Sequence, residues 1–167
     1  MLKKIVFALA LLTCGIGWTK PATVIDDTND LTARTWLVAD ASNQILGSKD
    51  TETVRPIASI TKVFTVLTVM DAKQDLSQYI RYNNGMMLTR QELIEMALVK
   101  SDNHAAELLC KHYQGGYGNC IGDMNANAYK WGLHQTTLVD ATGLLPGNTS
   151  TATDLLKLLN IAEQNYL

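Results

Sequence analysis

The sequence predicts a helix-rich α+β fold, with one β-hairpin and at least five helices in a single domain. The chain has 167 residues, of which 47% are hydrophobic and 18% are charged, a balance that supports one buried core. Residues 34–48 contain two short strand-like runs joined by turn residues, a pattern typical of paired strands. The later segments place apolar residues three and four positions apart, which is typical of helices.

The N-terminal segment indicates export from the cytoplasm. Residues 1–4 (M-L-K-K) are positively charged, and residues 5–18 form an uncharged, mostly apolar run that is short for a membrane span. We therefore expect residues 1–22 to be a signal peptide, with a buried first helix as the alternative. Cys14 follows L-L-T, a weak match to a lipoprotein box, so lipid anchoring at Cys14 is a second alternative.

The first elements expected after a polar linker at residues 19–31 are a hairpin and a long helix. Strands are expected at residues 34–39 (R-T-W-L-V-A) and 44–48 (Q-I-L-G-S), joined by the turn residues D-A-S-N. Pro56 then predicts the start of a helix that continues to about Lys73, because proline suits the first helical turn.

Residues 74–88 are expected to form a polar connector that leads into a second helix. Thr89 and Glu92 fit a capping box, and the apolar residues behind them follow the helical period. The sequence S-D-N then interrupts this helix. Either Asp102 or Asn103 can cap the next one.

Three more helices are expected further along the chain. One runs from His104 to Tyr113, where a pair of glycines stops it, and another covers the apolar pattern of residues 121–131. A turn-rich stretch follows. Ser150 is predicted to cap the last helix, which extends over residues 151–163.

Charge and cysteine content narrow the function classes. The net charge is −2 and no basic stripe is present, so no nucleic-acid partner is expected. No metal or other cofactor is expected either, because the histidines and cysteines lack metal-ligand spacing. Apart from Cys14, the cysteines are Cys110 and Cys120. In an oxidising compartment they form either a short disulfide or two buried free thiols.

One lysine stands out in the first expected helix. Lys62 lies in the segment A-S-I-T-K-V-F (58–64), in the first turn of a helix that is otherwise nearly all apolar. It follows Ser59 by three residues, so both side chains project from one helix face. Apolar neighbours and the positive end of the helix dipole both disfavour an ammonium there. A lysine that is partly neutral can take the proton of Ser59 and activate its hydroxyl. The alternative is a lysine whose charged end reaches solvent and has no catalytic role.

The S-D-N sequence at residues 101–103 is the second candidate for a catalytic motif. Ser101 and Asn103 are expected on a loop between two helices, where a hydroxyl and an amide can face a cleft. Taken alone, these residues are better explained as a helix cap. Together, S-x-x-K and S-D-N are the motif set of penicillin-binding proteins and serine β-lactamases.

Longer segments of the chain support this resemblance from about residue 33 to residue 165. The segments are R-P-I-A-S-I-T-K-V-F (55–64), M-A-L-V-K-S-D-N-H-A-A-E-L-L (96–109), H-Y-Q-G-G-Y (112–117), M-N-A-N-A-Y-K-W-G-L (124–133), D-A-T-G-L (140–144) and S-T-A-T-D-L (150–155). The chain resembles the low-molecular-weight penicillin-binding proteins, which are serine D-Ala-D-Ala peptidases, and is most similar to their D-alanyl-D-alanine endopeptidase branch. The resemblance implies a periplasmic protein in which residues 23–167 form one β-lactamase-like transpeptidase domain, shortened at its C-terminus, with an N-terminal hairpin and a helical subdomain.

The resemblance also implies roles for four residues. Ser59 would attack the carbonyl between two D-alanine-type centres of a peptidoglycan stem peptide, as an endopeptidase or a carboxypeptidase, and Lys62 would be its general base. Ser101 would relay the proton to the leaving amine, and Asn103 would hold Lys62 or the substrate. The backbone N–H of Ser59 would be one donor of the oxyanion hole. β-Lactams would acylate the same serine as inhibitors.

The family's third motif, K-T-G, does not occur in residues 1–167. That motif supplies a second oxyanion donor and binds the substrate carboxylate. Lys130-Trp131-Gly132 is no substitute, because it ends a predicted helix. The alternatives are therefore a catalytically impaired peptidoglycan- or penicillin-binding protein, or one half of a split enzyme. The expected hairpin also leaves a sheet edge unpaired, which invites a strand from a partner or a second copy.

Other hydrolase classes fit the sequence less well. A β-lactamase would have an E-x-x-L-N stretch for deacylation, and a Ser-His-Asp hydrolase would have G-x-S-x-G; neither sequence occurs. His104, His112 and His134 are therefore expected to have no catalytic role.

Overall fold

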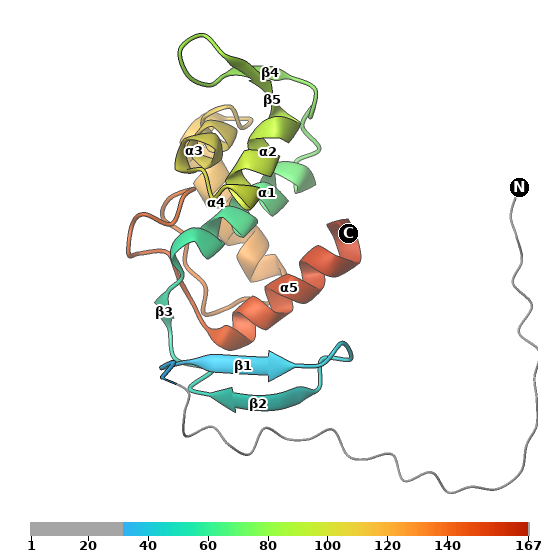
Figure 1. The fold of residues 1–167 in the computed structure, drawn as a ribbon, viewed down its shortest axis with the longest axis vertical. Helices are drawn as coiled ribbons and strands as arrows, with labels where there is room; N and C mark the ends of the chain where they lie inside the picture. Colours follow the sequence, from blue (N-terminus) through green and yellow to red (C-terminus); the bar gives the residue numbers. More distant parts are fainter. Residues whose placement is uncertain (1–31, 167) are drawn as a thin grey trace, which may run out of the picture.

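The structure is a computed structural model that describes residues 32–166. The predicted signal peptide and the lipid-anchoring alternative at Cys14 lie outside these residues. The elements are β1 (Trp36–Ala39), β2 (Ile45–Lys49), β3 (Arg55–Pro56), the 3₁₀ helix η1 (Ala58–Ile60), α1 (Thr61–Asp71), β4 (Tyr79–Arg81), β5 (Met87–Thr89), α2 (Arg90–Val99), α3 (Asn103–Lys111), α4 (Gly116–Lys130), β6 (Thr149–Ser150) and α5 (Ala152–Tyr166). Figure 1 shows α1–α4 gathered at one end, the β1–β2 hairpin at the other, and α5 between them. The prediction of a helix-rich α+β fold is confirmed.

The predicted N-terminal hairpin is confirmed. β1 and β2 pair antiparallel, with Trp36 opposite Lys49 and an irregularity between Val38 and Ala39. Asp40 shapes the turn, because its carboxylate accepts hydrogen bonds from the backbone N–H groups of Ser42 and Gln44 at 2.8 and 2.9 Å.

The prediction that Pro56 opens the first helix is wrong. Arg55 and Pro56 instead form the short strand β3, which pairs antiparallel with β6. The backbone N–H of Ile57 donates to the carbonyl of Asn148 at 3.0 Å, so this segment is held by a distant part of the chain. One 3₁₀ turn follows, and α1 begins only at Thr61.

The segment between α1 and α2 contains a second small hairpin, where the sequence predicted only a polar connector. β4 and β5 pair antiparallel across a turn that has positive φ angles at Asn84 and Gly85. Each strand is only three residues long, too short for its alternation to register as a pattern. The hairpin leads directly into α2, where the predicted capping box of Thr89 and Glu92 is confirmed.

Two further caps decide where the later helices begin. Asp102 caps α3, with its carboxylate accepting from the N–H of Ala105 at 2.8 Å. The predicted cap at Ser150 is wrong, because Ser150 lies in β6. Its neighbour Thr151 caps α5, with the hydroxyl accepting from the N–H of Asp154 at 3.1 Å.

The core is built around α1. This helix packs against α2, α3 and α4, and its residues 64–69 are all buried. Burial of this helix on nearly every side explains why most of its residues are apolar, and its buried polar residues are Thr61, Lys62, Thr65 and Thr68. Across residues 32–166, no helix combines the length and the apolar character needed to cross a lipid bilayer.

Candidate active site

Ser59 and Lys62 are in hydrogen-bond contact where the chain enters α1. Ser59 lies exposed in η1, whereas the side chain of Lys62, in the first turn of α1, is only 1% exposed. The Nζ atom of Lys62 donates to Ser59 Oγ at 3.0 Å and to the carbonyl oxygen of Thr142 at 2.7 Å. The nucleophile candidate can therefore meet a solute, while its proton acceptor is shielded from water.

Burial changes the acidity of this lysine. Loss of solvation lowers the pKa of Lys62 below its ordinary value, although the negative charges of Asp140 and Asp102 partly oppose the shift. A lower pKa increases the fraction of neutral amine near neutral pH. That is the form able to accept the proton of the Ser59 hydroxyl.

The turn-rich segment at residues 139–148 forms the wall that Lys62 touches. At Gly143, φ is +84°, and a Cβ atom placed there would lie 1.8 Å from the carbonyl oxygen of Ala58. Only glycine allows so close an approach of this turn to the Ser59 segment. The turn thereby brings the Thr142 carbonyl within reach of Lys62.

The structure places the 101–103 corner between α2 and α3. Ser101 has φ of +53°, a strained conformation for a residue with a side chain, and Asn103 is the first residue of α3. Tyr82, from the β4–β5 hairpin, donates its hydroxyl to Asp102 at 2.8 Å and ties that hairpin to the corner. The negative charge of Asp102 raises the pKa of Lys62 against the effect of burial.

The four predicted catalytic residues are not all joined by hydrogen bonds in the part of the chain that the structure describes. Ser59 and Lys62 form a hydrogen bond, but no side-chain hydrogen bond links Ser101 or Asn103 to either of them within residues 32–166. Hydrogen bonds of this kind often tighten only once substrate is bound. The roles of Ser101 and Asn103 remain predictions.

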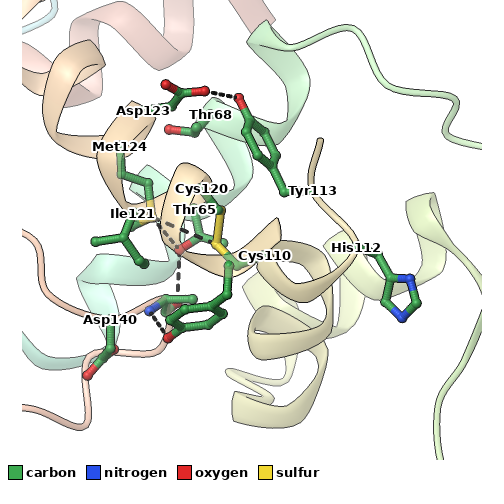
Figure 2. Close-up of a disulfide and its surroundings, with 12 residues drawn as sticks. Thr65, Thr68, Cys110, His112, Tyr113, Cys120, Ile121, Asp123, Met124 and Asp140 are labelled. Carbon is green, nitrogen blue, oxygen red and sulfur yellow. Dashed lines mark hydrogen bonds between the residues drawn. A yellow bond between two sulfur atoms is a disulfide. The ribbon is translucent and has the colours of Figure 1, made fainter. Parts of the chain in front are cut away.

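Cys110 and Cys120 are joined by a disulfide that connects α3 to α4. Both residues are fully buried and their Cα atoms are 5.3 Å apart. Figure 2 shows the sulfur bridge beside Met124, and Tyr113, which lies between α3 and α4, donating its hydroxyl to Asp123 of α4. Because α3 begins at Asn103, the bridge helps to fix the helix that carries the 101–103 corner.

Two residues of the site were not singled out by sequence reasoning, Asp140 and Thr142. Four groups of the 139–148 turn donate to the Asp140 carboxylate, and Thr142 supplies the carbonyl that holds Lys62. The spacing D-x-T-G, an acidic residue followed by a hydroxyl and a glycine, is typical of a side-chain-supported turn. That signal predicts a turn, but not which lysine it faces.

Comparisons with known proteins agree with this geometry. A family profile described as D-alanyl-D-alanine carboxypeptidase matches residues 22–81 and 73–167. A D-alanyl-D-alanine endopeptidase of Escherichia coli is 35% identical over 96% of this chain and 58% of its own length. A D-alanyl-D-alanine carboxypeptidase of Mycobacterium tuberculosis is 32% identical over 80% of this chain and 51% of its own. The chain therefore spans about half the length of the curated relatives it matches.

Solved structures show the same fold. A crystal structure of D-alanyl-D-alanine carboxypeptidase from Mycobacterium tuberculosis has a TM-score of 0.72 and 30% identity, covering 80% of this chain and 57% of that one. A penicillin-binding protein of Listeria monocytogenes in its cefotaxime-bound form has a TM-score of 0.73 and 23% identity, covering 81% and 64%. At that lower identity the likeness concerns the fold alone.

Proposed function

This chain belongs to the D-alanyl-D-alanine carboxypeptidase family, and on that premise we propose that it is a serine peptidase acting on peptidoglycan stem peptides. One observation carries the proposal. A buried lysine with a lowered pKa, Lys62, lies 3.0 Å from the exposed hydroxyl of Ser59. Nucleophilic catalysis by a hydroxyl requires an adjacent base. Lys62 supplies that base here, so the serine can be activated without a histidine.

The reaction begins with neutral Lys62. As Ser59 Oγ attacks the carbonyl carbon of a D-alanyl bond, its proton passes to Lys62 Nζ, and the backbone N–H of Ser59 donates to the developing oxyanion. The intermediate collapses to an acyl-enzyme when its C–N bond breaks and the proton on Lys62 Nζ passes through Ser101 to the leaving amine, which restores neutral Lys62. Asn103 holds Lys62 or the peptide. Water then releases the acyl group, and β-lactams acylate the same oxygen as inhibitors.

Labelling with a fluorescent penicillin tests this proposal. We expect a covalent adduct on the purified chain that disappears in Ser59→Ala, while Ser48→Ala, at an exposed serine of β2, retains it. Lys62→Met should remain folded and lose about 10²- to 10⁴-fold in acylation rate, the usual contribution of a general base. Lys130→Met, at an exposed lysine of α4, is the matched control. Absence of labelling in the wild-type chain would refute the proposed acylation.

Product analysis separates the two activities of this family. Mass spectrometry of digested muropeptides would show cross-linked dimers falling to monomers for an endopeptidase, and loss of a terminal D-alanine for a carboxypeptidase. We propose the endopeptidase activity, which the name and 35% identity of the Escherichia coli relative support. Release of terminal D-alanine alone would contradict it.

We further propose that the protein is exported to the periplasm with residues 1–22 as its signal peptide and 23–167 as one domain. The uncharged run at residues 5–18 and the buried Cys110–Cys120 disulfide support this location, since disulfides persist in oxidising compartments. Cell fractionation with N-terminal sequencing of the product tests it. A cytoplasmic product that retains Met1 would contradict it.

The free edge of β1 supports a further part of the proposal, strand pairing with a partner or a second copy. Within residues 32–166, β1 pairs only with β2. Beside β1, the side chains of Leu37, Leu156 and Leu159 line an open hollow between the strand and α5. An added strand would satisfy the backbone groups of β1 and cover these leucines.

A further inference from the structure

Residues 139–148 form a turn that is built around one carboxylate. Asp140 is 7% exposed, and its Oδ1 atom accepts from the backbone N–H groups of Thr142 and Gly143, both at 2.6 Å, and from the Thr142 hydroxyl at 3.0 Å. Its Oδ2 atom accepts from the N–H of Leu145 at 2.8 Å. The N–H of Leu144 is bound by the Thr142 hydroxyl at 3.1 Å. Four successive backbone donors are thus fixed by two side chains.

The ends of the same turn are closed by Asn148, which is fully buried. Its side-chain oxygen accepts from the N–H groups of Val139 and Asp140 at 3.0 and 3.3 Å, and its amide donates to the Leu145 carbonyl at 2.9 Å. Its backbone carbonyl accepts from Ile57, two residues before Ser59. The turn is therefore fixed in position relative to the Ser59 segment.

The middle of the turn is attached to the helices on both sides. The Thr65 hydroxyl of α1 donates to the Ala141 carbonyl at 2.8 Å, and the Ala141 N–H donates to the Tyr117 hydroxyl of α4 at 3.1 Å. With these groups engaged, the carbonyl of Thr142 is left to accept from Lys62 at 2.7 Å.

We propose that Asp140 is a positioning residue for Lys62: its carboxylate shapes the turn that aims the Thr142 carbonyl at Nζ. This inference rests on the function proposed above. A neutral amine has two N–H bonds and one lone pair. When the Thr142 carbonyl holds one N–H, the lone pair can be directed at the Ser59 hydroxyl, which then donates its proton to Nζ. The same carbonyl stabilises the ammonium that this transfer creates.

Like the Thr142 carbonyl, the negative charge of Asp140 stabilises the ammonium form of Lys62. Burial raises the pKa of Asp140, but hydrogen bonds from Gly143, Leu145 and Thr142 outweigh that effect and hold the pKa below its ordinary value, so the carboxylate is ionised. Asp140 and Asp102 each raise the pKa of Lys62 against the effect of burial. Removal of the Asp140 charge should therefore lower the pKa of Lys62 further.

Asp140→Asn tests the proposal, with Asp154→Asn as the matched control. Asp154 is also buried, at 3% exposed, and its carboxylate accepts from the Gln135 N–H at 2.9 Å, but it makes no hydrogen bond to the 139–148 turn or to Lys62. Both variants lose a carboxylate that anchors a loop. Only Asp140→Asn should reduce the rate of acylation by fluorescent penicillin on its high-pH plateau, by about 10- to 100-fold.

Two pH measurements distinguish positioning from a merely structural role. In Asp140→Asn the acid limb of the acylation rate should move to lower pH, and an NMR titration of ¹³C-labelled lysine should give a lower pKa for Lys62. The Lys62 signal is identified by its absence from Lys62→Met. Asp154→Asn should change neither measurement. If Asp140→Asn does not fold, Asp140→Glu decides, because it keeps the charge and should still lower the plateau rate.

The outcomes separate the two proposals. An unchanged plateau rate and an unchanged Lys62 titration in Asp140→Asn would overturn the positioning role. Equal effects of Asp140→Asn and Asp154→Asn on the plateau rate of acylation would also overturn the positioning role. If the wild-type chain takes up no penicillin, the proposed function fails, while the NMR titration still decides whether Asp140 controls Lys62.

Discussion

The helical cluster of α1–α4 and the layer formed by β1, β2 and α5 differ sharply in packing. The cluster contains most of the fully buried apolar side chains among residues 32–166, whereas β1 and β2 contribute none and α5 contributes only Leu158. Apolar side chains of the layer are exposed instead: Val38 by 38%, Ile45 by 53% and Leu159 by 62%. A hollow of about 420 Å³ lies between β1 and α5.

This difference separates the proposed chemistry from the proposed pairing with another strand. Ser59 and Lys62 lie where the chain enters the cluster, and their positions depend on α1 and on the 139–148 turn. Neither Ser59 nor Lys62 makes a side-chain hydrogen bond to the β1–β2 hairpin in the described part of the chain. We therefore expect changes in the cluster to alter stability strongly, and changes in the β1–β2–α5 layer to alter association without altering acylation.

Truncation of a cluster side chain should have the largest effect on stability. Leu109, in α3, has no exposed surface, so Leu109→Ala should lower the free energy of unfolding by about 2–5 kcal/mol through lost burial and a residual cavity. Urea denaturation followed by circular dichroism measures the change. Leu98→Ala, on the 46%-exposed side chain of Leu98 in α2, is the control and should cost far less. Equal costs for the two leucines would contradict the close packing assigned to the cluster.

The disulfide between α3 and α4 should have the next largest effect. The double variant Cys110→Ala/Cys120→Ala loses a cross-link between cysteines ten positions apart, and we expect unfolding to become easier by about 2–3 kcal/mol. Reductant should destabilise the wild-type chain by a similar amount and leave the double variant unchanged in the same urea titration. A wild-type unfolding curve that does not respond to complete reduction would show that the bridge has no such role.

Sequence reasoning succeeded where the signal is local. The turn at Asp40 and the capping box at Thr89 are formed by side chains that bind backbone groups two to four residues away. The Pro56 prediction failed because the preference of proline for a first helical turn is weak beside pairing with a distant strand. The β4–β5 hairpin was missed because its strands are only three residues long.

The same distinction applies to the site. Ser59 and Lys62 are three residues apart, so helical geometry alone predicted their contact. Lys62 and Thr142 are 80 residues apart, and the group that binds the lysine is a backbone carbonyl, which every residue has. The sequence marks the turn through Asp140 and Gly143, but only the folded structure shows which cation the turn faces.

The smallest effects are expected in the β1–β2–α5 layer. Leu159→Ala removes an exposed side chain and should change the free energy of unfolding by no more than about 0.5 kcal/mol.

Val38→Lys places a charge on the β1 edge, where it should prevent pairing with another strand. Light scattering over a concentration series should then show less association for Val38→Lys than for the wild-type chain, with equal penicillin acylation rates. If Val38→Lys lost acylation while remaining folded, the hairpin would belong to the site, and the separation between the two regions would not hold.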